Sequence, residues 1–469
     1  MILVIHAGWD FGEYSKYVFS QLSNTIYLVT LTSIFALIVG GVSAWFVALY
    51  NFPFKNLIET FYILMMLYPS YVMAIMLSEL STSFVGFGGL VLTMTIVTIP
   101  YVFLILTMSL RSQSQRLIQT ALMFGKNKTW IKLKLLLPLL KPAIIISLIF
   151  VISDTMSEFG ATYFMGVDTF MTGVYEIWLG LYEYEIGLKL SALIFIVVAF
   201  GVYFSGLFKK GKQLTNPIKT EPLKPETLKG FKAWLVTFIT FVPVLIGFII
   251  PSLVLLQWNI DAWGNTDWSE ILIVSLQSIA VATFVSLLTL FFSTEVLYHF
   301  KKDQRKARII YSTISSIYAL PGIVVAVTML YLVGILGFEW LAFFYFYGLV
   351  VKYIALSMDS IYTGLQKIDR NYYYSAKGLG KDSNWYKWWV QLPLAIKSYV
   401  VGGMLVWIDV MRELVIGYIV RPQWLDLLSV KIFSFVDLEL LYMSGPWILA
   451  MVLITLIPIY LVNKIFFVK

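Results

Sequence analysis

The sequence predicts an all-α polytopic membrane protein, with about eleven transmembrane helices in two parallel, pseudo-symmetric halves. Two observations support this fold class. Hydrophobic residues make up 59% of the 469 residues and charged residues only 13%, a composition typical of proteins that lie in a bilayer. In addition, residues 121–138 recur as residues 376–393 at a constant offset of 255 positions, and so long a repeat indicates two copies of one functional unit.

Each predicted span rests on a window of roughly 20 apolar residues, the length that crosses a bilayer as a helix. Unpaired backbone groups are too costly in lipid for anything except helices or closed barrels. The windows occupy residues 24–49, 57–80, 88–110, 139–160, 188–208, 231–257, 271–297, 309–333, 340–362, 393–415 and 445–464. We therefore expect a first half in residues 1–208, with about five spans, and a second in residues 231–469, with about six. Residues 209–230 are polar and contain proline, which predicts a cytoplasmic linker.

Basic residues predict the orientation of the spans, because lysine and arginine are retained on the cytoplasmic side. Most of the 34 basic residues lie inside when the cytoplasmic connections are residues 111–141, 209–232, 298–308 and 366–397. This orientation places the N-terminus outside and the C-terminus inside, since the first half has no counterpart of the span at 231–257. Either an upstream start or a deletion would account for that difference. The net charge of +8 then reflects topology and requires no nucleic-acid partner.

The repeated segment lies in a cytoplasmic connection of each half and predicts a short helix, a turn and a second helix. Its shared residues are Ala121, Gly125, Lys126, Trp130 and Pro138 in the first copy and Ala376, Gly380, Lys381, Trp385 and Pro393 in the second. A lone basic segment of this kind could simply contact anionic lipid headgroups. Lipid binding requires charge but no fixed geometry, so two copies with identical spacing favour docking surfaces for a two-fold partner.

At these residues the chain resembles the permease subunits of ABC importers, whose cytoplasmic loop carries E-A-A, a glycine after three further residues, and a proline thirteen residues beyond the glycine. Both loops, at 119–138 and 374–393, keep the glycine–proline spacing but only the last alanine of the triplet. The resemblance implies a transporter subunit of the bacterial inner membrane that is not itself an enzyme. It implies two copies of an ABC ATPase on the cytoplasmic face, which bind ATP and Mg, and a periplasmic or surface solute-binding protein. No cofactor is expected on the chain itself.

A narrower resemblance follows each loop. Residues 157–183 are similar to a stretch of the fused two-half permeases for ferric iron, and residues 409–433 are similar to a second such stretch. Thiamine permeases share much of the second stretch. The resemblance therefore implies ferric iron as the cargo, with thiamine or another small solute as the alternative. A secondary transporter or channel that works alone is the alternative from another class.

The chain carries no convincing nucleotide or zinc site. Residues 206–213 fit the pattern G-x-x-x-x-G-K, but Gln213 stands where a serine or threonine must reach the metal ion. The chain has no cysteine and only two histidines, His6 and His299, so no zinc-ligand spacing exists. We expect ATP to be hydrolysed by a separate subunit, and we predict no resident metal site with certainty.

Four acidic residues lie within two equivalent spans, where a carboxylate is costly and usually faces a polar path or a partner. They are Asp154, Glu158, Asp409 and Glu413. The two acids of each span are four residues apart, so we expect them to share one helix face. Carboxylate oxygens suit a hard cation, which predicts that these residues line the substrate path. The alternative is that they lie near the outer helix ends, where they cap neighbouring groups or pair with Lys352 and Arg412.

Overall fold

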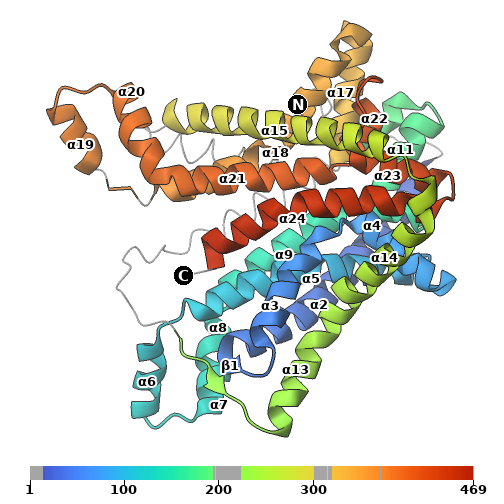
Figure 1. The fold of residues 1–469 in the computed structure, drawn as a ribbon. Helices are drawn as coiled ribbons and strands as arrows, with labels where there is room; N and C mark the ends of the chain where they lie inside the picture. Colours follow the sequence, from blue (N-terminus) through green and yellow to red (C-terminus); the bar gives the residue numbers. More distant parts are fainter. Residues whose placement is uncertain are drawn as a thin grey trace. The chain divides into compact units, whose positions relative to one another are not determined.

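The computed structural model describes residues 14–193, 196, 223–299, 314, 320–366, 368–369 and 371–467. In these ranges nearly all regular structure is helical, and strand is limited to two short segments, β1 and β2 (Figure 1). Among the described residues, seven helices are long and apolar enough to cross a membrane, or up to nine if two bent helix pairs each count as one span. The all-α polytopic fold is confirmed. The count of eleven is not, because the predicted spans 188–208 and 309–333 extend outside the described residues.

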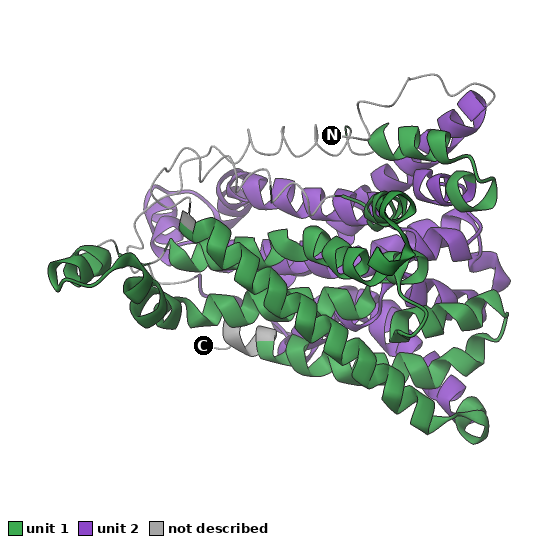
Figure 2. Cartoon of the chain, turned by 90° about the horizontal axis from the view of Figure 1, so that it is seen from above, with its two compact units in different colours: residues 1–9, 177–206, 261–469 green, residues 10–176, 207–260 purple. Residues whose placement is uncertain are grey.

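The chain divides into two compact units (Figure 2). Unit 1 comprises residues 1–9, 177–206 and 261–469, and unit 2 comprises residues 10–176 and 207–260. The segment that follows the linker therefore belongs to the unit built otherwise from the first half. The predicted halves follow the repeat in the sequence. The compact units do not coincide with those halves, because residues 177–206 belong to unit 1 and residues 207–260 belong to unit 2.

The elements of unit 2 begin with a long helix and end with the segment after the linker. They are α2 (Ser15–Leu49), β1 (Tyr50–Asn51), α3 (Lys55–Leu64), η2 (Met65–Leu67), α4 (Ser70–Leu80), η3 (Thr82–Phe84), α5 (Phe87–Arg111), α6 (Gln115–Met123), α7 (Lys128–Trp130), η4 (Ile131–Leu136), α8 (Leu137–Leu139), α9 (Lys141–Met156), α10 (Gly160–Phe164), α11 (Phe170–Tyr175), β2 (Glu226–Thr227), α13 (Phe231–Val244), η6 (Leu245–Ile249) and α14 (Ile250–Ala262). The last two residues of α14 are counted in unit 1.

The elements of unit 1 repeat much of this order. They are η5 (Glu176–Gly180), whose first residue is counted in unit 2, η7 (Trp263–Asn265), α15 (Trp268–His299), α17 (Gly322–Leu336), η8 (Phe338–Trp340), α18 (Leu341–Leu365), α19 (Asn371–Gly378), α20 (Ser383–Tyr386), η9 (Lys387–Gln391), α21 (Leu392–Arg412), α22 (Val415–Val420), α23 (Leu428–Asp437), η10 (Leu441–Ser444) and α24 (Gly445–Phe467).

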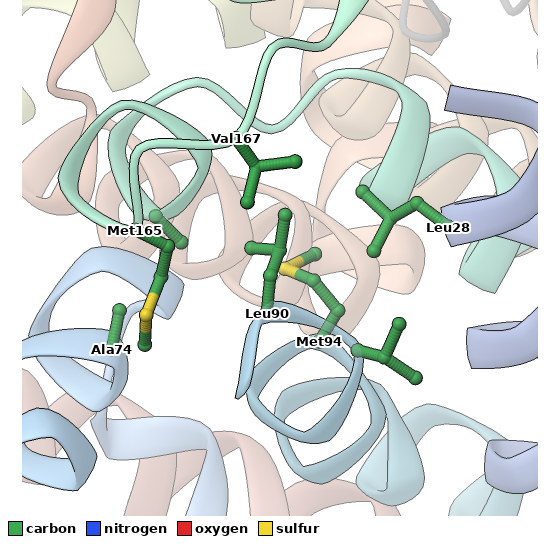
Figure 3. Packing of buried hydrophobic residues seen from close by; sticks show 8 residues of the cluster. Leu28, Ala74, Leu90, Met94, Met165 and Val167 are labelled. Atoms are coloured by element: carbon green, nitrogen blue, oxygen red, sulfur yellow. The ribbon is translucent and has the colours of Figure 1, made fainter. Parts of the chain in front are cut away.

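Long helices form the centre of each unit. In unit 2, α2 packs against α5 and α9, and in unit 1, α15 packs against α18 and α21. A buried cluster joins the helices of unit 2 to the short helix α10, and its labelled members converge in Figure 3. They are Leu28, Ala74, Leu90, Met94, Met165 and Val167. This packing holds the chain that follows α9 against the membrane helices.

The predicted span at 57–80 is broken near its middle, where α3 with η2 meets α4 at an angle of 102°. Pro69 lies at the break and adopts an extended conformation, with φ −60° and ψ 157°. Tyr68, the residue before it, is also extended. Proline disfavours the helical conformation in the residue that precedes it, which accounts for the break.

Candidate functional site

The first repeated loop has the predicted form of a short helix, a turn and a second helix. Helix α6 ends before Gly125, which has a φ of +70°. The Lys126 N–H donates to the carbonyl of Ala121 at 3.1 Å, so the helix ends in a Schellman motif that requires a left-handed residue at the glycine. Asn127 then caps α7, because its Oδ1 accepts from the Trp130 N–H at 2.7 Å.

The second loop repeats this geometry with different side chains. Gly380 has a φ of +69°. The Lys381 N–H donates to the carbonyl of Ala376 at 3.0 Å, and Asp382 Oδ1 accepts from the Trp385 N–H at 2.9 Å. The alanine, the glycine and the capping residue therefore have the same roles in both copies, and each role is a local backbone requirement.

The tips of both loops are exposed and carry apolar groups. Phe124 is 77% exposed, and Leu379, at the equivalent position, is 76% exposed. A Cβ added at Gly125 or Gly380 would meet nothing within 4 Å, so the need for glycine comes from the backbone angle and not from crowding within the chain. Both turns therefore present an apolar side chain to the outside at the same position of the repeat.

The shared lysine, tryptophan and proline also have equivalent places. Lys126 Nζ lies 5.2 Å from the Trp130 ring centroid, and Lys381 Nζ lies 5.3 Å from that of Trp385. Such distances are typical of cation–π contacts. Each loop then continues through a π-helical segment, η4 or η9, toward a proline near the start of the next helix. These prolines are Pro138 in α8 and Pro393 in α21.

The acids of the first half do not share one helix face, contrary to the expectation from their spacing. Helix α9 ends at Met156, so Asp154 lies in its last turn and Glu158 follows the break. Glu158 Oε1 accepts from the Ala161 N–H of α10 at 2.8 Å, and Oε2 accepts from the Ser70 hydroxyl at 2.5 Å. The carboxylate thus caps the next short helix, as the structural alternative predicted.

The second half has the same break. Helix α21 ends at Arg412, and Glu413 Oε1 accepts from the Ile416 N–H at 3.2 Å. Its Oε2 forms an ion pair with Lys352 Nζ at 2.5 Å and also accepts from the Tyr353 hydroxyl. The Lys352–Glu413 pair was one of the partnerships predicted in the structural alternative. Asp409, like Asp154, is half-buried in the last turn of its helix.

The surroundings of the two glutamates differ at the first residue of a neighbouring helix. Helix α4 starts with Ser70, whereas α17 starts with Gly322. A Cβ at Gly322 would lie 2.9 Å from Lys352 Nζ and 3.0 Å from Glu413 Oε1. Glycine therefore leaves room for the ion pair, where the first half uses a serine hydroxyl. Neither Ser70 nor Tyr353 was identified from the sequence, because neither lies near its glutamate along the chain.

Within the described ranges, no group of three or more histidine, aspartate or glutamate residues lies in a position to hold a metal ion. His6 and the segment 206–213 lie outside those ranges.

Two comparisons show which known proteins the chain is similar to. Residues 32–209, which include the first loop, match the family described as the binding-protein-dependent transport system inner membrane component. The chain is also 23% identical over 465 residues to the Fe(3+)-transport system permease protein FbpB 2 of Haemophilus influenzae, which covers 94% of this chain and 89% of the relative. The chain is therefore similar to the membrane components of binding-protein-dependent importers. Together with the apolar spans, these matches indicate a multi-pass inner-membrane transport component, a class that works with an ATPase and a solute-binding protein.

Proposed function

We propose that this permease forms the transmembrane path of an importer for ferric iron and binds two copies of an ATPase subunit through loops 119–138 and 374–393. ATP and Mg are bound by those subunits. The observation that carries the proposal is the equivalent geometry of the two loops, each with a glycine at positive φ and an exposed apolar tip. One partner surface can recognise both loops, because recognition depends on the backbone turn that they share.

The cargo assignment rests on the chain's similarity to the ferric-iron permease and on the acids near the helix breaks. Carboxylate oxygens are ligands that a hard cation prefers. We propose that Asp154, Glu158, Asp409 and Glu413 line the substrate path, in addition to the role of the two glutamates in capping the helices that follow. Thiamine or another small solute is the second candidate cargo, since thiamine permeases share much of the stretch at 409–433.

The coupling role is tested with the double variant Gly125→Trp, Gly380→Trp. Tryptophan at a φ near +70° is strained and adds a bulky group at each tip, so the variant should lose the ATPase subunit. Co-purification of the ATPase and ATP-dependent uptake of radiolabelled ferric citrate into proteoliposomes, supplied with the binding protein, are the measurements. We expect both to fall at least tenfold while the permease remains folded and monodisperse.

Gly166→Trp is the matched control. Gly166 also has a positive φ, +62°, with nothing within 4 Å of an added Cβ, but it lies in a loop predicted to be outside. It should retain the ATPase. Full uptake by the double variant would refute the docking role, and uptake of thiamine in place of ferric iron by the unmodified permease would refute the cargo assignment.

A further inference from the structure

The end of the linker is an ordered part of unit 2. Residues Glu226–Thr227 form β2, which pairs in parallel with β1 in the register Tyr50 to Glu226 and Asn51 to Thr227. Leu223 is buried in a cluster with Leu110 and Leu136. The polar sequence of the linker predicted only a tether, and these contacts place its last residues beside the first coupling loop.

Glu226 bridges two lysines of that loop. Its Oε1 lies 3.1 Å from Lys128 Nζ, and its Oε2 lies 3.4 Å from Lys132 Nζ. Burial opposes the charged form, but the hydrogen bond from Lys128 and the charge of Lys132 outweigh it, so the pKa of Glu226 lies below its ordinary value. Lys132 Nζ also donates to the Tyr50 hydroxyl at 2.9 Å and lies 4.7 Å from the centroid of that ring.

The second coupling loop has an equivalent cluster built from other segments. Lys387, 255 positions after Lys132, lies with its Nζ 4.7 Å from the ring centroid of Tyr298 and 2.5 Å from Glu295 Oε1. Both of these partners are on α15. Each loop therefore has a lysine that contacts a tyrosine and a carboxylate, but the carboxylate comes from the linker in one half and from a membrane helix in the other.

Both clusters join a coupling loop to one end of a long membrane helix. Tyr50 follows the last residue of α2, and Tyr298 is the penultimate residue of α15. Those helices pack against α5 and α9 in unit 2 and against α18 and α21 in unit 1. The side chains of both lysines are largely buried, 21% exposed for Lys132 and 8% for Lys387. A displacement of either loop must therefore move its helix end or break the cluster.

We propose that Lys132 and Lys387 are positioning residues that transmit movement of the coupling loops to α2 and α15. Glu226 makes the end of the linker part of the contact between the first loop and α2. We call each lysine with its tyrosine and glutamate a clamp. The proposal rests on the function of the loops proposed above.

The carboxylate of the first clamp is more exposed, 42% for Glu226 against 33% for Glu295, so salt should weaken the first clamp more than the second.

The physical part of the proposal is tested by hydrogen exchange on the purified permease without its ATPase. Glu226→Gln and Lys132→Gln should each speed amide exchange in residues 115–136 roughly two- to fivefold, as expected for loss of a partly exposed ion pair. Exchange in residues 371–391 should not change. Lys134→Gln is the matched control, since it removes an exposed basic charge from the same segment. Lys132→Arg, which keeps the charge, should retain most of the protection.

The functional part is tested by the number of cargo molecules imported per ATP hydrolysed. A clamp that only stabilised the loop would change ATPase binding and uptake together. A transmitting clamp should instead lower the ratio of import to hydrolysis in Glu226→Gln while the ATPase remains bound. Unchanged exchange in residues 115–136, or an unchanged ratio, would overturn the proposal. If the unmodified permease bound no ATPase, the proposed function would fail, whereas the exchange experiment would still decide whether the clamp exists.

Discussion

Glu413 is a buried carboxylate whose charge is balanced within unit 1. Lys352 and Tyr353 donate to one of its oxygens and the Ile416 N–H donates to the other. Glu158 has the same capping role but is only half-buried, and its Oε2 accepts from the hydroxyl of Ser70. The glutamate after the helix break therefore accepts from a lysine in one half and from a serine hydroxyl in the other.

This difference predicts separate effects for Glu158→Gln and Glu413→Gln. Glu413→Gln leaves Lys352 without its buried partner and should destabilise the permease by about 3–5 kcal/mol. Glu158→Gln can still accept from the Ala161 N–H, so it should cost only about 1 kcal/mol while it lowers ferric-iron uptake through loss of charge. Thermal unfolding in detergent and uptake into proteoliposomes are the measurements.

The control is the double variant Lys352→Met, Glu413→Gln, which removes both charges and should recover much of the lost stability. Normal ferric-iron uptake by Glu158→Gln, in protein that folds normally, would show that this residue is a helix cap and not part of the path.

At the scale of whole elements, two neighbouring glycines of α2 show how closely its helices pack. A Cβ at Gly40 would lie 2.9 Å from Val102 Cβ and 3.0 Å from the Ile99 carbonyl oxygen, both on α5. A Cβ at Gly41 would lie 3.6 Å from Leu106 Cδ1, an ordinary contact. Small residues of this kind let membrane helices approach one another, and only Gly40 is required for that approach.

We therefore expect Gly40→Ala to destabilise unit 2 by about 1–3 kcal/mol, because α2 and α5 must separate to accept the methyl group. Gly41→Ala adds the same methyl group one residue later and should be neutral or slightly stabilising, since alanine favours a helix more than glycine does. The measurement is the thermal unfolding midpoint, which should be lower for Gly40→Ala than for Gly41→Ala. Equal midpoints would contradict the close packing of α2 on α5.

At the scale of the whole molecule, the distribution of basic residues predicts the orientation of the chain in the bilayer. Reporters fused at residue 10 and at residue 220 should label the outside and the cytoplasm respectively, because most lysines and arginines then lie inside. Accessibility of both reporters to impermeant reagents in intact and permeabilised cells is the measurement. Cytoplasmic labelling at both positions would contradict the eleven-span topology. The division of the chain into two permease halves, residues 1–208 and 231–469, stays a prediction.

The features that could be predicted are those set by residues close together in the sequence. The turn of each coupling loop depends on Gly125 or Gly380 and on hydrogen bonds that reach at most five residues along the chain, so its geometry followed from the repeated sequence. The apolar windows likewise predicted the long helices, because lipid imposes the same requirement on every span. The end of α9 before Glu158 was missed, although Gly160 is a possible stop signal there. The second half has leucine and valine after Glu413, which give no such signal.

The sequence by itself determined the membrane class, the repeat and the form of the coupling loops, because these depend on composition and on neighbours along the chain. Only the tertiary structure decided which charges meet. Lys352 and Glu413 are 61 positions apart, and Lys132 and Glu226 are 94 positions apart. Pairing at such separations is set by how the helices pack. For the same reason, the linker's role at the first clamp could not be inferred from its polar composition, which describes its solubility and not its contacts.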